Sequence, residues 1–198
     1  MKQGKEVKFN DHKPRVVTWE DIPLPILEEV RVFTTEKGIC AIFLGRGKEK
    51  ESARFIEKCP VPVKLSEKPT KHSSIHTALK EYVEGKRTTF SFPFDFLAGT
   101  PFEKEVWRVL PAIPYGRCVS YQWVATRIGR PRATRAVGNA IGKNPIPILI
   151  PCHRVIRKNG SLGGFSSGLA IKEALLKIEG CSGPPSNLPE TGNPKEGS

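Results

Sequence analysis

The chain has 198 residues, of which 32 are Lys or Arg and 20 are Asp or Glu, so its formal net charge is +12. The composition, 38% hydrophobic and 26% charged, excludes a disordered or collagen-like chain and fits a globular protein. The longest apolar run, residues 146–151, is far shorter than the ~20 residues that cross a bilayer, and residues 1–13 lack the apolar stretch of a signal peptide. We therefore expect no membrane partner and a location in the cytoplasm, or in the nucleus if the source is a eukaryote.

The positive charge is concentrated in the second half of the chain. Residues 117–158 contain nine basic and no acidic side chains. A solvated surface usually mixes both signs, whereas Lys and Arg without carboxylates favour contact with phosphates. The pattern indicates a polyanionic partner such as a nucleic acid. A basic surface without a partner is the alternative.

The first half predicts a small α/β domain over residues 1–98. Two apolar, β-prone runs flank a turn at Gly38, which is typical of a hairpin. Apolar residues recur at helical spacing from Ile75 to Val83, ahead of a stop at Gly85. The expected elements are hairpin strands at 30–34 and 39–44, a short helix at 52–58, a helix at 75–83 and a short strand at 89–94.

The second half predicts a mostly helical domain over residues 99–181. Thr100, Pro101 and Glu103 form the pattern of a capping box that begins a helix. Two short helices follow at 121–128, capped by Ser120, and at 132–141, joined by a turn that contains Gly129. This is the pattern of a helix-turn-helix in a winged-helix-like domain, with an ordinary helical hairpin as the alternative. A last helix is expected at 169–179.

The tail, residues 182–198, is rich in Gly, Pro, Ser and Asn and has no apolar set to bury. Such a composition predicts disorder. Residues 188–192 read Leu-Pro-Glu-Thr-Gly, which resembles a sortase recognition pentapeptide, but no apolar stretch follows it. We interpret this match as chance or as a tag.

The number of cysteines is five, which is odd, and no C-x-x-C pair occurs. We therefore expect reduced thiols, no disulfide framework and no closed zinc site. The expected passive residues are Cys40, Cys59, Cys118 and Cys181.

Cys152 differs from the other cysteines because it ends an apolar run stiffened by three prolines and is followed by His153 and Arg154. Cationic neighbours stabilise a thiolate, which is the nucleophilic form of cysteine. The alternative is a small buried hydrophobic residue. Adjacent side chains of an extended segment point apart, so proton transfer to His153 needs a bend or a bridging water.

Pro151-Cys152-His153-Arg154-Val155 resembles the active-site motif of the O6-alkylguanine-DNA alkyltransferase family, also called methylated-DNA–protein-cysteine methyltransferases. The resemblance covers residues 72–180 closely and residues 1–71 loosely. Further blocks match family motifs in the family's order: Gly99-Thr100-Pro101-Phe102, Val106-Trp107, Ile113-Pro114-Tyr115-Gly116, Ser120-Tyr121, Arg135-Ala136-Val137-Gly138, Asn144-Pro145 and Gly168-Leu169-Ala170-Ile171-Lys172.

The resemblance implies repair of DNA by direct reversal of damage, without a cofactor. A monomer would flip O6-alkylguanine, or O4-alkylthymine, out of double-stranded DNA and transfer the alkyl group irreversibly to Cys152. His153 would take the thiol proton through a water, Glu179 would orient His153, and Asn144 would fix the turn before the cysteine loop. Tyr121 would contact the flipped nucleotide.

The resemblance also implies which residues contact DNA and the flipped base. Arg135 would enter the base stack from a recognition helix that lies in the minor groove, where sequence readout is weak. The implied DNA contacts are Ser120, Tyr121, Ala133, Arg135, Ala136 and Gly138. The implied pocket residues are Pro147, Val155, Phe165 and Ser166.

Two features depart from the family pattern. Phe165 stands where the family often has Tyr, so we expect alkyl transfer to persist with altered preference for bulky groups. The other cysteines and the histidines, namely Cys40, Cys59, His12, His72 and His76, do not match the zinc site of some members, so we expect no metal.

Two further interpretations stay open. The first is a DNA-binding protein without catalysis, either a regulator or a lesion sensor, although Cys152 argues against a sensor that lacks the cysteine. The second is a cysteine hydrolase, although no hydrolase motif surrounds Cys152.

Overall fold

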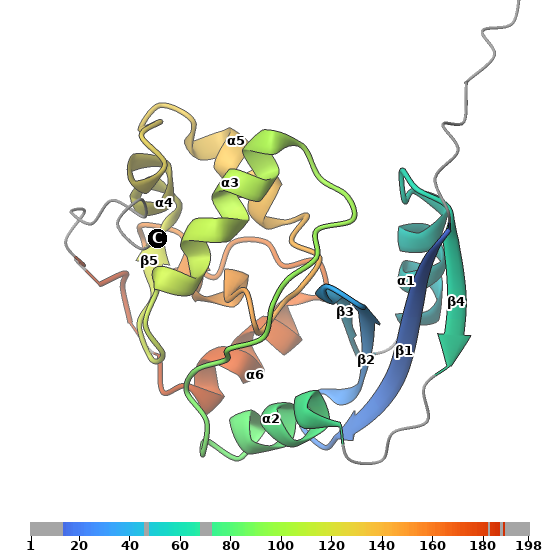
Figure 1. Cartoon of the computed structure of the whole chain (residues 1–198). Coiled ribbons are helices and arrows are strands. Elements are labelled where there is room, and N and C mark those ends of the chain that lie inside the picture. The colour runs from blue at the N-terminus through green and yellow to red at the C-terminus, as the bar shows by residue number, and fades with distance from the viewer. Residues whose placement is uncertain (1–13, 46–47, 68–72, 182, 187, 189–198) are drawn as a thin grey trace, which may run out of the picture.

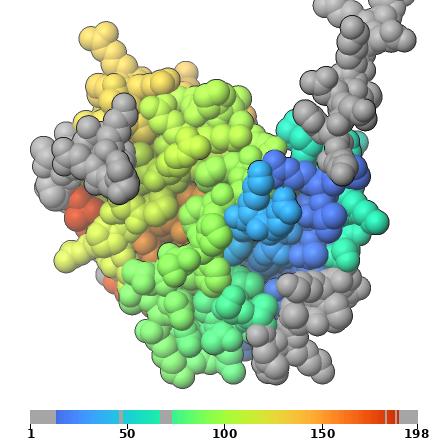
Figure 2. All heavy atoms as spheres, in the orientation of Figure 1, coloured from blue at the N-terminus to red at the C-terminus, as the bar shows by residue number. Residues whose placement is uncertain are grey.

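The computed structural model describes residues 14–45, 48–67, 73–181, 183–186 and 188. Two parts lie against each other in Figure 1, a β-sheet built from the first third of the chain and a group of short helices built from the rest. Figure 2 shows their surfaces in direct contact, with blue N-terminal atoms beside green atoms of the middle of the chain.

The sheet has four strands in the order β3-β2-β1-β4. The predicted hairpin is confirmed as β2 (Glu28–Thr35) and β3 (Gly38–Leu44), which pair antiparallel. β1 (Arg15–Leu24) pairs antiparallel with β2, and β4 (Val63–Glu67) pairs parallel with β1. The sequence analysis did not predict β1, whose alternation is interrupted by Glu20, Asp21 and Pro23, or β4, a short strand whose partner β1 is distant in sequence.

Two helices accompany the sheet. α1 spans Lys48–Glu57, four residues earlier than the predicted start, and α2 spans Ser74–Val83 as predicted. The side chain of Ser73 caps α2 by accepting a hydrogen bond from the backbone N–H of His76. The buried face of α2 carries the expected apolar residues.

The predicted strand at 89–94 is wrong. This segment makes a single parallel bridge between Phe94 and Ile39 instead of a ladder. Ile39 donates its N–H to the carbonyl of Pro93 at 2.9 Å. A Cβ on Gly38, whose φ is 144°, would lie only 2.2 Å from that carbonyl oxygen. Glycine therefore lets the connection cross the edge of the sheet at this point.

The second half contains the predicted helices with shifted ends. α3 (Pro101–Val109) begins with the predicted capping box of Thr100 and Glu103. α4 (Tyr121–Arg127) and α5 (Thr134–Ile141) follow, and α6 (Leu169–Ile178) ends at Glu179. α5 starts two residues late because residues 131 and 132 lie in the preceding turn.

Short elements connect these helices. A 3-10 turn, η1 (Leu110–Ala112), continues α3, and a second, η2 (Cys152–Arg154), carries the predicted nucleophile. β5 (Val119–Ser120) and β6 (Val155–Ile156) pair parallel and were not predicted. This pairing joins the segment before α4 to the segment after the cysteine.

One buried cluster draws side chains from both halves of the chain, including strands β1 to β3 and helices α2, α3, α4 and α5. Ile42 of β3 donates its N–H to the carbonyl of Pro145 at 2.8 Å, so the sheet supports the loop that leads to Cys152. Trp107 of α3 donates its indole N–H to the carbonyl of Ala140 at 2.8 Å. The proposed domain division at residues 98 and 99 stays a prediction.

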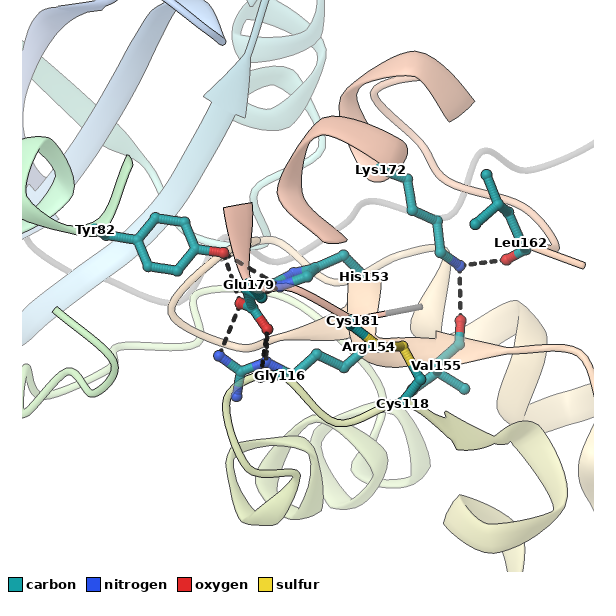
Figure 3. The surroundings of a disulfide bond; sticks show 10 residues. All are labelled: Tyr82, Gly116, Cys118, His153, Arg154, Val155, Leu162, Lys172, Glu179 and Cys181. Atoms are coloured by element: carbon teal, nitrogen blue, oxygen red, sulfur yellow. Dashed lines mark hydrogen bonds and ion pairs between the residues drawn. A yellow bond between two sulfur atoms is a disulfide. The ribbon is translucent and has the colours of Figure 1, made fainter. Parts of the chain in front are cut away.

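The prediction that all five thiols are reduced is wrong for one pair. Cys118 and Cys181 form a disulfide across 63 residues (Figure 3). Cys40, Cys59 and Cys152 are free. The bond joins the residue before β5 to the residue that follows Gly180 at the end of α6. Sequence spacing gave no signal for it, because the partners meet only after β5, β6 and α6 have packed.

The described part of the tail, residues 183–186 and 188, lies against the second half, and the expected disorder of residues 182, 187 and 189–198 falls outside the described residues. Ser186 donates its N–H to the carbonyl of Cys118 at 2.6 Å, and Trp123 donates its indole N–H to the carbonyl of Leu188 at 3.3 Å. Residues 189–192 of the sortase-like pentapeptide lie outside the described residues. Within the described ranges, no helix is long and apolar enough to cross a membrane.

We predict that replacing Cys118 and Cys181 together with serine lowers the free energy of unfolding by about 2–4 kcal/mol, because the cross-link restricts the unfolded chain. Urea unfolding with and without reductant measures the effect. The urea midpoint of the wild type should fall when reductant is added, whereas the midpoint of the double variant should not change. Equal wild-type midpoints with and without reductant would show that the bond does not form or does not stabilise.

Candidate active site

The loop before the cysteine is held by one amide side chain. Asn144 donates from Nδ2 to the carbonyl of Ile150 at 2.8 Å and accepts at Oδ1 from the N–H of Ile146 at 3.1 Å. Ile148 lies between them with a φ of 73°, a conformation that β-branched residues rarely adopt. The buried amide therefore fixes a strained loop, and the hinge role expected for Asn144 stays a prediction.

Cys152 begins the η2 turn and is only 4% exposed. Its Sγ accepts a hydrogen bond from Nδ2 of Asn144 at 3.0 Å. Burial raises the pKa of the Cys152 thiol, while the hydrogen bond from Asn144 and the charge of Lys172 act in the opposite direction. The resting thiol is therefore protonated and needs a base before it can act as a nucleophile.

His153 supplies a candidate base. The η2 turn directs its side chain inward, where it is fully buried, and places Nε2 2.8 Å from Oε1 of Glu179. Burial lowers the pKa of His153, against the attraction of the Glu179 carboxylate and with the repulsion of Arg154 and Lys172. The neutral ring then donates from Nε2 to Glu179, and Nδ1 keeps its lone pair.

The lone pair on Nδ1 of His153 has no hydrogen-bond partner, and in the described part of the chain it is the one such buried side-chain nitrogen or oxygen. Buried polar atoms are normally paired, so an unpaired one needs a reason. A histidine that acts as a base needs a free lone pair to accept a proton, which would explain the unpaired Nδ1. Residues 152–154 form a 3-10 turn, so Cys152 and His153 do not lie on an extended segment.

Glu179 follows the last residue of α6 and is buried with its charge. Arg154 donates from Nε to Oε2 at 2.8 Å and from Nη2 to Oε1 at 2.9 Å (Figure 3). Its Nη1 donates to the carbonyl of Ile113 at 2.6 Å. Burial alone would raise the pKa of Glu179, but the hydrogen bonds from His153 and Arg154 and the charge of Arg154 outweigh it and lower the pKa to about 2. The carboxylate is therefore ionised at neutral pH.

The structure corrects the expected source of positive charge at the thiol. The sequence analysis assigned it to Arg154 and His153, but the Arg154 guanidinium faces Glu179. Lys172 of α6 is the cation whose charge lowers the pKa of Cys152. Burial lowers the pKa of Lys172 itself to about 8.

Lys172 is fully buried and donates from Nζ to the carbonyls of Val155, at 2.6 Å, and of Leu162 (Figure 3). The sequence analysis missed its importance as an individual residue. A signal existed, because Lys172 shares a helix face with Leu175 and Glu179 at helical spacing. A lysine on an apolar helix face indicates a buried partner.

Tyr82 was also missed, because it fits the apolar face of α2. Its hydroxyl donates to Oε1 of Glu179 at 2.7 Å (Figure 3). The N-terminal half of the chain therefore reaches the His153–Glu179 pair.

The residues expected at DNA lie on α4, on α5 and just before these helices. Arg135 and Ala136 are exposed on α5, and Ala133 precedes α5. Ser120 caps α4 by accepting from the N–H of Trp123 at 3.1 Å, so its hydroxyl has a structural partner.

Tyr121 begins α4 and packs between α5 and the segment that contains Gly163. A Cβ on Gly138 would lie 3.7 Å from the Tyr121 ring, and one on Gly163 would lie 2.5 Å from its hydroxyl. Burial raises the pKa of Tyr121, against a backbone hydrogen bond at Gly164. The glycines thus make room for the phenol.

The expected pocket residues differ in exposure. Pro147 and Val155 are buried, Phe165 is half-buried and Ser166 is exposed. Among the residues that the structure describes, no group of three or more His, Cys, Asp and Glu side chains could hold a metal ion.

These features define a class of protein in which a buried cysteine is followed in sequence by the histidine of a buried histidine–carboxylate pair. The whole site rests on a helical unit that a four-stranded sheet supports. Two family models match the chain, described as 6-O-methylguanine DNA methyltransferase, DNA binding domain, at residues 101–181, and its ribonuclease-like domain at residues 21–96.

Named relatives agree with these family models. The chain is 41% identical over 137 residues to the methylated-DNA–protein-cysteine methyltransferase of Mycobacterium bovis, covering 68% of this chain and 82% of that one. It is 50% identical over 101 residues to the inducible enzyme of Bacillus subtilis, covering 51% and 56%. The chain therefore belongs to the methylated-DNA–protein-cysteine methyltransferase family.

Solved structures show the same fold. The crystal structure of Mycobacterium tuberculosis O6-methylguanine methyltransferase has a TM-score of 0.71 at 33% identity, covering 85% of this chain and 95% of that one. The M. tuberculosis protein in complex with DNA has a TM-score of 0.67 at 32% identity, covering 83% and 92%. The alignments span 53–63% of the length of several curated relatives.

We predict that Lys172→Met raises the pKa of Cys152 by about one pH unit, because the thiolate loses the nearby positive charge. The pH dependence of thiolate absorbance measures this pKa in a Cys40→Ser, Cys59→Ser background. Lys177→Met, at an exposed position of the same helix, is the matched control and should leave the pKa unchanged. An unchanged midpoint in Lys172→Met would contradict the assignment of the cation.

Proposed function

We propose that this protein repairs O6-alkylguanine in double-stranded DNA by moving the alkyl group to its own Cys152. The observation that carries the proposal is the unpaired Nδ1 of buried, neutral His153, on the residue next to a buried thiol. Family membership supplies the reaction to which this base and nucleophile belong.

The chemical step balances without a cofactor. His153 takes the proton of the Cys152 thiol at Nδ1 through a bridging water. Sγ then forms a bond to the alkyl carbon while the bond from that carbon to guanine O6 breaks, and the purine anion receives a proton from Tyr121 or His153. The positive charge that appears on His153 lies against ionised Glu179, as in other activated nucleophiles.

The thioether product explains a reaction that occurs once. Reversal would have to expel the Cys152 thiolate from a thioether, and a thiolate is a poor leaving group from an alkyl carbon at neutral pH. Each chain therefore repairs one base. O4-alkylthymine presents a similar alkyl–oxygen bond and is the second candidate substrate.

The burial of Cys152 requires base flipping, because a base inside the duplex stack cannot reach a thiol that is only 4% exposed. We infer that Pro147, Val155 and Phe165 form the pocket for the flipped base. Ser166 and Tyr121 would contact its polar edge. Phe165 supplies a ring without the hydroxyl that the family often has.

We infer that α4, the turn after it and α5 act as a helix-turn-helix of winged-helix type on duplex DNA. The turn and the start of α5 project from the upper left of the molecule in Figure 2. Exposed Arg135 and the small side chains of Ala133, Ala136 and Gly138 suit entry into the minor groove. The acid-free charge of residues 117–158 supports phosphate contact.

The alternatives make different predictions for this site. A lesion sensor of the kind that lacks the cysteine has no nucleophile to activate, and a cysteine hydrolase needs hydrogen-bond donors that stabilise an oxyanion. We also propose that the protein acts as a monomer in the cytoplasm, or in the nucleus of a eukaryote.

We predict that a duplex oligonucleotide carrying O6-methylguanine adds one methyl group per chain to the Cys152 peptide, as measured by intact and peptide mass spectrometry. Cys152→Ala should gain nothing, whereas Cys40→Ala, which removes another buried thiol, should react as the wild type does. Lesion binding without a mass gain would favour the sensor, and the absence of both would exclude alkyl transfer and lesion sensing.

We predict that Arg135→Ala slows transfer from duplex DNA by about tenfold or more, because it removes the side chain that replaces the flipped base in the stack. Transfer from free O6-benzylguanine should stay within about twofold, since no stack is opened. Arg132→Ala, which removes a charge from the neighbouring turn, should weaken DNA binding but leave the transfer rate at saturating duplex near that of the wild type. Equal losses on duplex and free base would contradict the role of Arg135.

A further inference from the structure

Tyr82 brings a polar group from the N-terminal half of the chain into the centre of the site. It lies in α2, its side chain is fully buried, and its hydroxyl is 2.7 Å from Oε1 of Glu179 and 3.4 Å from Nε2 of His153. α2 lies beside the end of α6 in Figure 1, and Figure 3 shows the phenol pointing at the carboxylate. No step of the proposed reaction uses this hydroxyl.

The hydroxyl acts as a fixed hydrogen-bond donor. Burial and the nearby Glu179 charge raise the pKa of Tyr82 far above its ordinary value, so the phenol keeps its proton at every pH where the protein is folded. Its ring packs against Phe90, with centroids 5.5 Å apart, and edge-on against Tyr115 at 6.1 Å. These contacts hold the donor in place.

Oε1 of Glu179 is the oxygen that faces the imidazole, and it receives three donors. They are the Tyr82 hydroxyl at 2.7 Å, Nε2 of His153 at 2.8 Å and Nη2 of Arg154 at 2.9 Å. A donor on a carboxylate oxygen withdraws charge from it. The Tyr82 hydroxyl therefore weakens the pull of Glu179 on a protonated imidazole while holding the carboxylate at a fixed rotation.

We propose that Tyr82 is a positioning residue for alkyl transfer, which acts through Glu179 to orient His153 and to keep it neutral until it accepts the thiol proton. This inference rests on the proposed alkyl transfer. Under this proposal the N-terminal half contributes the Tyr82 hydroxyl to the site, in addition to the structural support that its sheet provides.

Other groups face the His153–Glu179 pair and stay unchanged when only the Tyr82 hydroxyl is removed. Arg154 contacts both carboxylate oxygens, and the N–H of Gly116 lies 3.3 Å from Oε2. The charges of Lys172 and Glu179 affect the pKa of His153, and the charges of Glu179 and Arg154 affect the pKa of Tyr115. Cys152 is the remaining titratable neighbour on the η2 turn.

The test is the Tyr82→Phe variant in the full chain, with single-turnover methyl transfer from an O6-methylguanine duplex measured from pH 5 to 9. We expect the rate at neutral pH to fall about three- to tenfold. The acid limb of the profile, where His153 becomes protonated, should move to a pH about 0.5 to 1 higher, because Glu179 then holds the imidazolium more strongly. Duplex binding should not change.

Tyr115→Phe is the matched control. Its hydroxyl donates to the carbonyl of Ile178 at 3.0 Å, one residue from Glu179, and does not touch the carboxylate. This variant should keep the wild-type midpoint. Incorporation of 3-fluorotyrosine at position 82 retains the hydroxyl and strengthens it as a donor, so it should move the acid limb to lower pH.

A Tyr82→Phe midpoint equal to that of the wild type would overturn the proposal, even if the rate falls, because a packing defect alone does not move the profile. Nitrogen-15 titration of the His153 ring in both proteins gives the same comparison without any reaction. If the wild type transfers no methyl group, the proposed function fails, and the ring titration still decides whether Tyr82 controls His153.

Discussion

The structure depends on one buried charge, the carboxylate of Glu179 at the end of α6. An ion removed from water costs several kcal/mol unless other groups replace its hydration. Here Arg154 supplies two hydrogen bonds, and His153 and Tyr82 supply one each. These donors come from distant parts of the chain, so folding must bring α2, the η2 turn and α6 together before the charge is tolerated.

The same carboxylate sets the chemistry of its neighbours. Because Arg154 and His153 keep the pKa of Glu179 near 2, the carboxylate accepts a hydrogen bond from Nε2 of His153 at neutral pH. Burial keeps the pKa of His153 low, so the ring stays neutral with its lone pair on Nδ1. Since burial also raises the pKa of Cys152, both the thiol and the His153 imidazole are neutral before the reaction.

The surrounding fold serves to hold this arrangement. Asn144 fixes the cysteine loop, and β3 supports that loop through the carbonyl of Pro145. The disulfide between Cys118 and Cys181 fastens the chain just after Glu179 to the segment before α4. The proposed DNA-binding helices and the reacting groups are therefore parts of one connected framework.

Local patterns in the sequence predicted much of this. The capping box at Thr100 and the apolar spacing of α2 depend on neighbours within a few residues, and the structure has both. The Cys152 loop was recognisable from its prolines and its family motif. Strand β4, the disulfide and the role of Tyr82 depend on partners far away in the chain, for which local spacing carries no signal. For Lys172 the spacing in α6 indicates burial but does not identify the partner. Tyr82 in particular is indistinguishable from an apolar core residue until α2 and α6 are placed side by side.

The state of the His153 ring in the wild-type protein tests the central claim most directly. Long-range proton–nitrogen NMR at neutral pH distinguishes a ring protonated at Nε2 from one protonated at Nδ1 or at both nitrogens. The account predicts a neutral ring with the proton on Nε2 and a bare Nδ1. A ring protonated at Nδ1, or at both nitrogens, would contradict it, because His153 could not then accept the thiol proton.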